Sequence, residues 1–347
     1  MWSSDPRPRG FVLAVTLWLL AGIAVAVGLM MLWSRSQVEH ARLDSERLQD
    51  EVSALETRDT LLYIAATREF TVAGLPVEPL AGDTVAMRKL DEMGAASRDP
   101  VGGELRLDGT LYRGRGDSTF AIQDEAGLFS LRRPMPERLD RFLALEGVDK
   151  AKIPRLRDAL LDYIDADDLN RLQGAERRDY ERAKRPPPAN RPLLLPSELG
   201  NVLGWDELPP EQLHRIIEHV TVLYAGASNL NTTPADLLPF WVPNCPEACD
   251  LIRKRREQRP FLNGQEAEAL TLGRLSGDAA IDYRSVAEGI LRLDVWGRTG
   301  RGQRYHVRLT PLADQRGPWT IMAAYPVQRP ADDRDAESTQ SPLLAGP

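Results

Sequence analysis

The sequence predicts an α+β fold. A long N-terminal helix, transmembrane in its first half and amphipathic in its second, packs on a small antiparallel sheet, and a large all-α domain is inserted between strands of that sheet. Three observations lead to this prediction: an apolar run at residues 11–33, strand-like alternation in two groups far apart in the chain, and helical spacing with proline-rich breaks between those groups. At 347 residues the chain is long enough for two folded units beyond the apolar run.

The apolar run has the length of a membrane span. From Phe11 to Trp33 there are 23 residues with one polar side chain, Thr16. At ~1.5 Å rise per residue, such a helix reaches across the ~30 Å hydrocarbon core of a bilayer. A secretory signal has a shorter apolar core and then a small-residue cleavage site, which is not evident here. Arg7 and Arg9 precede the run, so we expect a cytoplasmic N-terminus, a single membrane pass and export of the remaining chain.

The helix is predicted to continue beyond the membrane. Residues 34–70 contain no proline or glycine, and the apolar residues at 48, 52, 55, 62 and 66 follow one helical face. The sequence therefore predicts one helix from about Phe11 to Phe70. Its apolar stripe is short and is interrupted at Ser45 and Asp59, which favours packing on a sheet over a free coiled-coil stalk.

The predicted strands fall into two groups. The first lies in residues 105–131, with a short turn signal at Asp108 and Gly109. The second lies near the C-terminus, where apolar and polar residues alternate in three runs. The apolar positions of these runs are Leu291, Leu293 and Val295, then Tyr305, Val307 and Leu309, then Trp319, Ile321, Ala323 and Tyr325.

These patterns divide the chain into consecutive segments. The predicted segments are residues 1–10 before the span, 11–33 in the membrane, 34–133 as the second half of the helix with the first part of the α/β domain, 134–282 as the helical insert, 283–329 as the second part of the α/β domain, and 330–347 as a polar, disordered tail.

Composition and motifs exclude several functions. The net charge of −7 and the pI near 5.4 provide no broad basic surface for nucleic acid. In the stretch HRIIEH, His214 and His219 are five residues apart and diverge by about 140° around a helix, whereas zinc proteases place the two histidines on one face. The chain also has no Gly-x-Ser-x-Gly motif and no Walker loop, so we expect no enzymatic activity.

One alternative function comes from residues 229–270, which are similar to a helix-hairpin-helix unit of DNA-binding proteins. In such units a glycine-containing hairpin brings backbone amides close to phosphate. Here the hairpin reads VPNCPEAC and contains no glycine, which weakens the hypothesis. The alternative is a membrane-anchored periplasmic protein that binds DNA through this unit.

Five carboxylates follow a predicted amphipathic helix that ends near residue 164. Clustered carboxylates repel one another unless they are solvated, neutralised or shared by a cation, and Ca²⁺ takes about 6 to 8 oxygen ligands. Arg171, Arg177 and Arg178 lie in the same stretch, so a solvated acidic loop and a cation site both remain open. The five carboxylates are Asp165, Asp167, Asp168, Glu176 and Asp179.

The chain contains two cysteines, Cys245 and Cys249. In a regular helix residues at this spacing have Cβ atoms about 5 to 6 Å apart, beyond the roughly 3.5 to 4.5 Å of a disulfide. Pro243 and Pro246 indicate a loop or a first helical turn, where closure is feasible. In an oxidising periplasm we expect a disulfide, and zinc binding by two thiols alone is disfavoured.

The N-terminal junction resembles a known processing site. Arg9 and Gly10, followed by Phe11 and an apolar helix, are similar to the site in type IV pilins and type II secretion pseudopilins. This resemblance implies that prepilin peptidase cleaves after Gly10, which makes residues 1–10 a leader, and that Phe11 is N-methylated. An ordinary uncleaved anchor is the other interpretation of the junction alone. The fifth residue after cleavage would be Val15, where most such subunits carry glutamate.

Further segments make the resemblance specific. DEAGLFSL, LLDYIDADDLNRLQGAERRDY, NRPLLLPSEL, NLNTTPADLLPF and RKRREQRPFLNGQEAEAL resemble, in this order, segments of the type II secretion protein K family. Members often have tryptophan at the position of Tyr163 and asparagine at that of Ser130. The resemblance implies a minor pseudopilin in the inner membrane of a Gram-negative bacterium, with a pseudopilin fold, a periplasmic C-terminal part and no role in nucleic-acid binding.

The same resemblance implies the protein's site residues and partners. Protein K typically lacks the glutamate that Val15 replaces, which suits a subunit at the pseudopilus tip. The implied partners are minor pseudopilins similar to proteins I and J, with which it starts pseudopilus assembly in support of protein export across the outer membrane. In this family the inserted domain can bind calcium, which makes Asp165, Asp167, Asp168, Glu176 and Asp179 the expected contributors to a calcium site.

Overall fold

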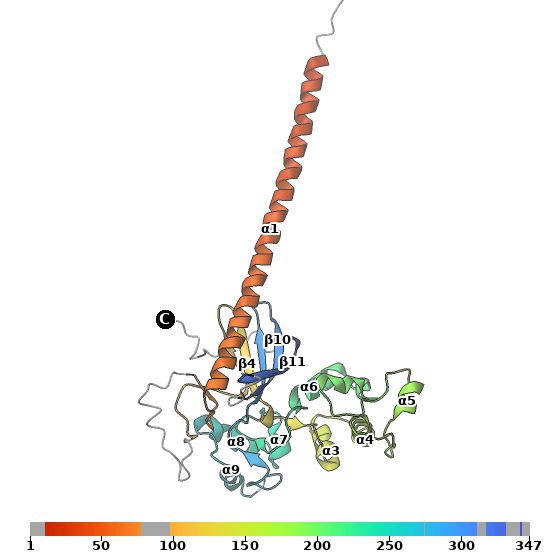
Figure 1. The fold of residues 1–347 in the computed structure, drawn as a ribbon, viewed down its shortest axis with the longest axis vertical. Helices are drawn as coiled ribbons and strands as arrows, with labels where there is room; N and C mark the ends of the chain where they lie inside the picture. The colour runs from red at the N-terminus through yellow and green to blue at the C-terminus, as the bar shows by residue number, and fades with distance from the viewer. Residues whose placement is uncertain (1–10, 78–97, 274, 311–316, 331–340, 342–347) are drawn as a thin grey trace, which may run out of the picture. The chain divides into compact units, whose positions relative to one another are not determined.

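The computed structural model describes residues 11–77, 98–273, 275–310, 317–330 and 341. The chain divides into two compact units, residues 1–52 and residues 53–347. The predicted leader, residues 1–10, and nearly all of the predicted tail lie outside the described residues. The predicted α+β class is confirmed: a long apolar N-terminal helix is followed by antiparallel strands and by a series of shorter helices (Figure 1).

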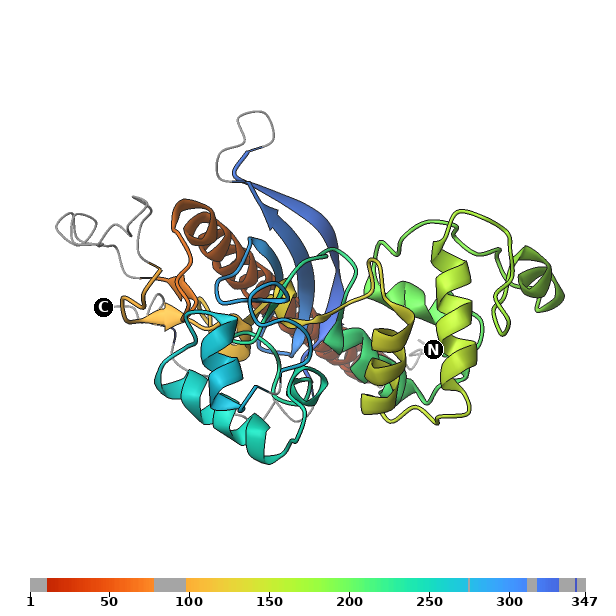
Figure 2. The same cartoon turned by 90° about the horizontal axis from the view of Figure 1, so that it is seen from below.

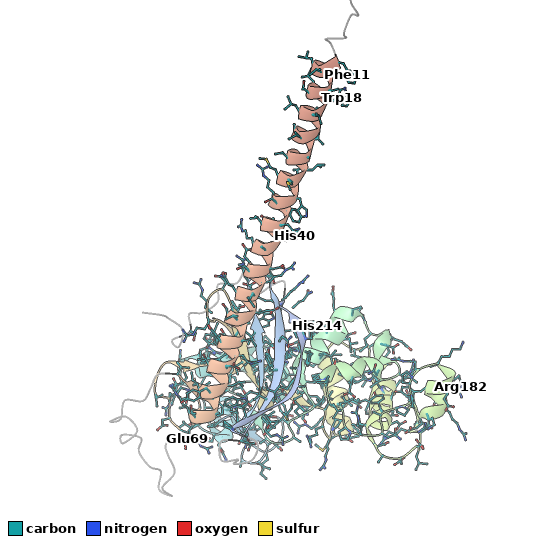
Figure 3. All side chains as sticks on the ribbon, turned by 45° about the horizontal axis from the view of Figure 1, so that its top comes forward. Phe11, Trp18, His40, Glu69, Arg182 and His214 are labelled. Atoms are coloured by element: carbon teal, nitrogen blue, oxygen red, sulfur yellow. A yellow bond between two sulfur atoms is a disulfide. The ribbon has the colours of Figure 1, made fainter. Side chains whose placement is uncertain are left out.

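The first helix, α1, runs from Phe11 to Thr67, three residues short of the predicted end. By length and composition it is able to cross a membrane. The apolar side chains of α1 in the first unit of the chain are exposed, and Trp18, for example, is 81% exposed (Figure 3). Apolar side chains exposed in this way are costly in water and favourable in lipid, which agrees with the predicted span.

The second unit is built on a five-stranded antiparallel sheet with the order β11-β10-β9-β4-β3. Its two central strands, β4 and β9, come from the two separate strand groups of the sequence and pair with Ile122 opposite Leu293. The insert therefore leaves and rejoins one continuous sheet. The strands are β3 (Asp108–Arg113), β4 (Thr119–Asp124), β9 (Ile290–Trp296), β10 (Arg301–Leu309) and β11 (Trp319–Gln328).

The predicted turn at Asp108 and Gly109 is wrong. Both residues lie inside β3, and the pairing of β3 with β4 shifts register between Asp108 and Leu111. Gly109 has a φ of 83°, which a residue without Cβ adopts readily, so the turn-forming dipeptide here makes a bulge. Leu105 belongs instead to β2 (Glu104–Leu105), which pairs with β1 (Leu75–Pro76).

The end of α1 covers one face of the sheet. Leu61 and Ile64 of the helix are buried in one apolar cluster with Phe120, Leu293 and Val307 of the strands. Burial of such side chains stabilises the fold by roughly 1.5 to 3 kcal/mol each. Sheet packing therefore accounts for the last turns of the helix, whereas Leu48, Val52 and Leu55 of the predicted stripe are 62%, 44% and 44% exposed.

Helices α3 to α9 lie between β5 and β8 in the chain and form two groups, α3–α6 and α7–α9, which lie on different sides in the view of Figure 2. A short parallel strand pair closes each group: Phe129 of β5 pairs with Val220 of β6, and Ser228 of β7 pairs with Tyr283 of β8. The elements are β5 (Phe129–Ser130), α3 (Pro136–Leu145), α4 (Ile153–Ile164), α5 (Arg177–Arg182), α6 (Pro210–His219), β6 (Val220–Thr221), β7 (Ser228–Asn229), α7 (Leu238–Trp241), α8 (Glu247–Gln258), α9 (Gly264–Leu270) and β8 (Tyr283–Arg284), with 3-10 turns η1 (Glu125–Gly127), η2 (Pro196–Asn201) and η3 (Trp205–Glu207).

One apolar core runs through both helical groups. The rings of Phe129 and Phe142 stack 4.3 Å apart, and Phe240 from the second group meets Phe129 edge-on. Trp205 is fully buried and donates its indole N–H to the backbone oxygen of Leu156 at 2.9 Å. The two helical groups are therefore joined by aromatic packing.

Asp124, at the end of β4, ties the α7–α9 group to the sheet. Its carboxylate is 1% exposed and accepts hydrogen bonds from Asn229 Nδ2 at 2.9 Å, Thr232 Oγ1 at 3.1 Å and the Ala126 amide at 3.1 Å. Burial raises the pKa of Asp124 to about 6, against the opposing effect of these donors.

Replacing Asp124 with alanine is expected to lower the free energy of unfolding by about 1 to 3 kcal/mol, because several buried donors lose their acceptor. Urea denaturation of the purified protein, followed by tryptophan fluorescence, measures the loss. Asp117→Ala is the control, since Asp117 is exposed, and should change stability by less than about 0.5 kcal/mol. Equal effects of the two substitutions would contradict the role of Asp124.

Candidate functional site

The N-terminal junction is described only from Phe11, since Gly10 lies outside the described residues. Phe11 is the first residue of α1 and is 71% exposed, and Val15 is 39% exposed on the same helix. The polar group of Thr16 bonds to the backbone oxygen of Leu13 at 2.9 Å, so the helix itself satisfies it. Cleavage after Gly10 and methylation of Phe11 remain predictions.

The acidic residues lie around the loop from α4 to α5. Asp165 is the C-cap of α4 and Glu176 is the N-cap of α5. The loop comes very close to α4 at Gly174, where an added Cβ would lie 1.8 Å from Asp162 Oδ2. Glycine at this position therefore allows the loop to fold over Asp162, a fully buried carboxylate.

Arg171 neutralises part of this cluster. Its Nη1 lies 2.5 Å from Asp162 Oδ1 and 2.5 Å from Asp165 Oδ2, and its backbone amide donates to Asp162 Oδ2 at 3.1 Å. Asp162 was missed by the sequence analysis, because it lies within the helix at a position that reads as part of the polar face. Asp162 is buried because the loop closes over it at Gly174, and this contact between separate parts of the chain is not visible in the local sequence pattern.

Glu176 is the most buried of the cluster's carboxylates that make no ion pair with another described residue. It is 2% exposed, and neither of its carboxylate oxygens has a hydrogen-bond partner within the described part of the chain. Burial and the charges of Asp162, Asp165, Asp168 and Asp167 raise the pKa of Glu176 to about 7. These five carboxylates therefore share one electrostatic environment.

The other predicted residues have local partners. Asp167 Oδ1 accepts from the Leu169 amide at 2.9 Å, and Asp168 Oδ1 accepts from Asn190 Nδ2 at 3.2 Å. Asp179 accepts from Asn170 Nδ2 at 2.9 Å and from the Glu176 amide at 3.2 Å, and these donors lower its pKa. Asp179 therefore stabilises the start of α5, while the other four predicted carboxylates gather with Asp162.

In this arrangement Arg171 lies between the carboxylates. Among the described residues, no three His, Cys, Asp or Glu side chains form a group disposed to hold a metal ion. The donor chemistry nevertheless fits a hard cation. The oxygens are carboxylates, and both oxygens of Glu176 and Oδ1 of Asp165 are buried with no hydrogen-bond partner in the part of the chain that the structure describes.

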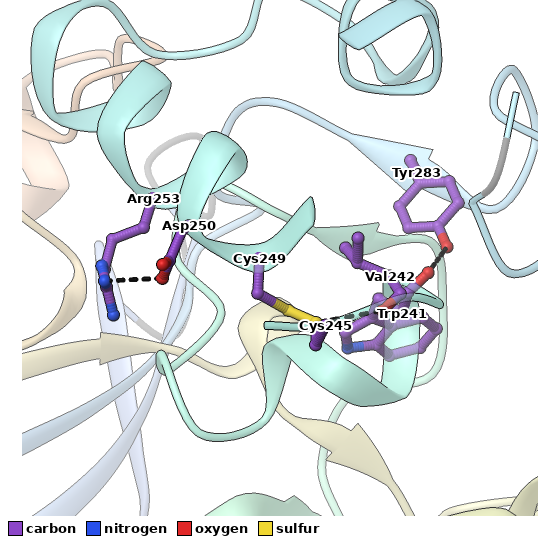
Figure 4. Close-up of a disulfide and its surroundings, with 7 residues drawn as sticks. All are labelled: Trp241, Val242, Cys245, Cys249, Asp250, Arg253 and Tyr283. Carbon is purple, nitrogen blue, oxygen red and sulfur yellow. Dashed lines mark hydrogen bonds and ion pairs between the residues drawn. A yellow bond between two sulfur atoms is a disulfide. The ribbon is translucent and has the colours of Figure 1, made fainter. Parts of the chain in front are cut away.

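Cys245 and Cys249 form a disulfide at the start of α8, with their Cα atoms 5.1 Å apart (Figure 4). Cys245 precedes the helix and Cys249 lies in its first turn, the local geometry for which closure was expected. Tyr283 contacts the preceding segment, with its hydroxyl 3.5 Å from the backbone oxygen of Trp241. This disulfide lies in the segment VPNCPEAC, which would be the hairpin if the chain contained a DNA-binding helix-hairpin-helix unit.

A buried ionic network joins α6 to the face of the sheet that α1 does not cover. Arg304 on β10 binds Asp294 through two contacts of 2.7 Å, and it binds Glu218 of α6 at 2.7 and 2.8 Å. Arg292 adds a second cation, 3.4 Å from Glu218. Burial would raise the pKa of Glu218, but Arg292 and Arg304 outweigh it and lower that pKa to about 2.

His219, the next residue of α6, has a structural role. Its Nδ1 lies 2.7 Å from Glu146 at the end of α3, and its Nε2 lies 2.8 Å from Asp236. Burial would lower the pKa of His219, but Asp236 and Glu146 raise it to about 9. His214 of the same HRIIEH stretch is exposed. The two histidines thus have different environments, as the five-residue spacing predicted.

Comparisons with known proteins agree with this architecture. Residues 123–225, which include the whole α3–α6 group, match the family model for type II secretion system (T2SS), protein K. A chain in the crystal structure of the GspK-GspI-GspJ complex from enterotoxigenic Escherichia coli has a similar fold, with a TM-score of 0.50 and 16% identity over 85% of this chain and 99% of that chain. A search of the curated proteins finds no match.

The match to the protein K family model covers residues 123–225, and the similar solved structure agrees with it in fold. The resemblance to type II secretion protein K that the sequence segments predicted is confirmed over those residues. The one helix among the described residues that is long and apolar enough to cross a membrane is consistent with a single-pass inner-membrane protein. The DNA-binding alternative is not supported.

Proposed function

We propose that this protein is a minor pseudopilin at the tip of the type II secretion pseudopilus. There it initiates assembly with minor pseudopilins similar to GspI and GspJ and supports protein export across the outer membrane. The observation that carries the proposal is the insertion of helices α3 to α9 into the strand order of the sheet domain. Its role is organisational, and we expect no catalysis.

The enlarged head favours a terminal position. Subunits of a pilin-like fibre stack through their N-terminal helices and the adjacent globular domains. A head that carries two extra helical groups would collide with a subunit placed above it, whereas at the end of the fibre no subunit lies above. The proposed topology has a cytoplasmic N-terminus before Phe11 and a periplasmic second unit, in accord with Arg7 and Arg9 before the span.

Val15 supports the same position. A carboxylate in lipid is costly unless it is paired, and in pilin-like fibres the glutamate at this position can pair with the N-terminal amine of a neighbouring subunit. Val15 has no charge and cannot make this pair. The lack of this contact suits a subunit that begins the fibre.

Purification of the full chain from its native inner membrane tests the proposal. We expect two smaller minor pseudopilins to co-purify in a stable ternary complex, and mass spectrometry to show methylated Phe11 as the N-terminus. An intact Met1 and no associated pseudopilins would instead indicate a plain anchored periplasmic protein.

Val15→Glu is expected to leave cleavage by prepilin peptidase unchanged and to reduce secretion, because the new carboxylate offers a pairing site that a tip subunit lacks. The measurements are the mass of the processed N-terminus and the amount of exported protein in the medium. Val15→Leu is the matched control. Secretion at the wild-type level in Val15→Glu would contradict the assigned role of Val15.

We also propose that the acidic cluster binds calcium. Asp162, Asp165, Asp167, Asp168 and Glu176 would hold the ion, and Asp179 would act only by ordering α5. Binding would require Arg171 to leave its position between Asp162 and Asp165. The support is the pair of buried oxygens of Glu176 that have no hydrogen-bond partner among the described residues, since a cation would offset the repulsion by the neighbouring carboxylates that raises the pKa of Glu176.

Calcium is expected to raise the melting temperature, because a ligand at 100 times its Kd stabilises the folded state by about 2.7 kcal/mol. Glu176→Gln should weaken calcium binding at least about tenfold in calorimetric titration. The control is Glu181→Gln, the same change at an exposed position of α5. Equal calcium affinity of the two variants would contradict the site.

A further inference from the structure

A small cavity opens where α3, the β6–β7 connection and α7 meet. Its volume is about 150 Å³, and a cavity of that size can hold a benzene-sized group. Its walls include Arg133, Arg138, Met135, Tyr224 and Trp241, and none of the described residues that line it is acidic. It differs in place and in charge from the acidic cluster beyond α4.

The two cations of the cavity are Arg133 and Arg138. Within the described part of the chain, neither Arg133 nor Arg138 makes an ion pair. Arg138 lies over the rings of Trp241 at 4.8 Å and Phe240 at 5.7 Å. Burial lowers the pKa of Arg138 and outweighs the attraction of Asp282, which raises it, so keeping this charge out of water has a cost. An anion in the cavity would reduce that cost.

Two elements of the cavity wall also carry N–H groups, of which the indole N–H of Trp241 is covered by protein rather than open to the cavity. Trp241 is 2% exposed, and its indole N–H is buried without a hydrogen-bond partner among the described residues. α3 begins beside the cavity with Met135 as its N-cap, and no side chain caps the helix. The first turn of a helix carries unsatisfied N–H groups and a partial positive charge, which favour an anion.

The remaining walls favour an organic anion attached to an apolar group. Met135 is 55% exposed at the rim, and Phe129 and Tyr224 supply aromatic surface. Planar guanidinium groups bind carboxylates with matched geometry, and aromatic walls suit the carbon chain that bears them. The described lining residues include two arginines and no carboxylate, so the wall favours an anionic ligand over a cationic one.

We propose that this cavity is a carboxylate-binding site that receives an acidic side chain of a partner polypeptide. Arg138 holds the carboxylate, Arg133 steers it from the rim, and Met135 and Tyr224 contact its carbon chain. Because the cavity lies between the two helical groups, a seated side chain would contact α3 and α7 together. The site does not depend on the position of the subunit in the pseudopilus.

Calorimetric titration of the full chain in detergent tests the site, with the peptide acetyl-Ala-Glu-Leu-amide and with succinate as probes. We expect the peptide to bind, and the same peptide with glutamine in place of glutamate to bind at least about tenfold more weakly. Tighter binding of the peptide than of succinate would identify a polypeptide as the source of the carboxylate. Equal binding of the two would keep the carboxylate site and overturn its assignment to a polypeptide.

Two variants connect the binding to the cavity. Arg138→Gln should weaken the glutamate peptide at least about tenfold and abolish its preference over the glutamine peptide. Arg259→Gln, at an exposed arginine outside this cavity, should leave both properties unchanged. Far-UV circular dichroism and melting temperature show whether each variant is folded. Unchanged glutamate binding in a folded Arg138→Gln protein, or no preference for glutamate in the wild type, would overturn the proposal.

Discussion

Replacing Arg304 with methionine is expected to lower the free energy of unfolding of the second unit by about 3 to 5 kcal/mol. The guanidinium lies between two carboxylates in a buried position, and Arg304 itself is 6% exposed. Methionine fills much of the same space but leaves Asp294 without its cation, and it leaves Glu218 with only the more distant Arg292. The main cost is therefore uncompensated charge rather than lost packing.

The control is Arg308→Met on the same strand, where the side chain is exposed and a change of less than about 0.5 kcal/mol is expected. Adding Glu218→Gln to Arg304→Met should restore part of the loss, because it removes one of the two stranded charges. Urea denaturation of both single variants and the double variant measures this coupling. A loss below about 1 kcal/mol for Arg304→Met would show that water solvates the network.

The same network predicts an acid dependence. The pKa of Glu218 is lowered to about 2 in the folded protein, below the usual value of 4.5. A carboxyl whose pKa is lowered by folding contributes stability that is fully present above its unfolded pKa and is lost as the pH falls toward its folded pKa. Arg304→Met should therefore flatten the loss of stability between pH 4.5 and 2.

The strand pattern shows what could be predicted from the sequence. Leu291, Leu293 and Val295 alternate with charged residues, and this period of two correctly places β9 and its apolar face. Alternation ordinarily indicates that the second face is solvated. Here Arg292 and Asp294 on that face are 9% and 6% exposed, because the helical insert folds back and covers them.

The local sequence pattern does not reveal that the insert covers this face of the sheet. The partner of Arg304 is Glu218, 86 residues earlier in the chain, and the partner of His306 is Glu125, 181 residues earlier. In sequence, Glu218 reads as an ordinary polar residue between two histidines. The helical spacing of the insert is recognisable in the sequence. The ion pairs that hold the insert on the sheet become apparent only in the structure, where a surface of the insert meets a face of the sheet.

The acidic cluster illustrates the same limit. Four of the five carboxylates singled out in the sequence share one environment, because the loop that carries them is short and closes locally. Asp162 was missed because the fold over Gly174 is what buries it. Asp179 has the right charge and spacing, but its oxygens are used by the first turn of α5 and by Asn170.

The second large effect concerns His219 and is opposite in pH direction to that of Glu218. We expect the free energy of unfolding to fall by about 2 to 3 kcal/mol as the pH rises from 6.5 to 9. The pKa of His219 is raised from 6.5 to about 9 in the folded protein. A histidine whose pKa is raised by folding contributes stability that is fully present below 6.5 and is lost as the pH rises through 9.

The charges that face His219 make this loss specific. Glu146 at the end of α3 is 3% exposed and also receives Arg215 Nε at 3.1 Å, while Asp236 lies on the far side of the ring and is largely exposed. Deprotonation of His219 therefore leaves Glu146 buried with one remaining cation, and α3, α6 and the segment before α7 lose their common contact.

Urea denaturation at a series of pH values tests this role of His219. His219→Gln should be less stable than the wild type at pH 6 and should lose the fall in stability between pH 6.5 and 9. His214→Gln, on the same helix but exposed (Figure 3), should keep the wild-type pH profile. A profile that still falls in His219→Gln would assign the titration to another group and leave His219 as a neutral hydrogen-bonding residue.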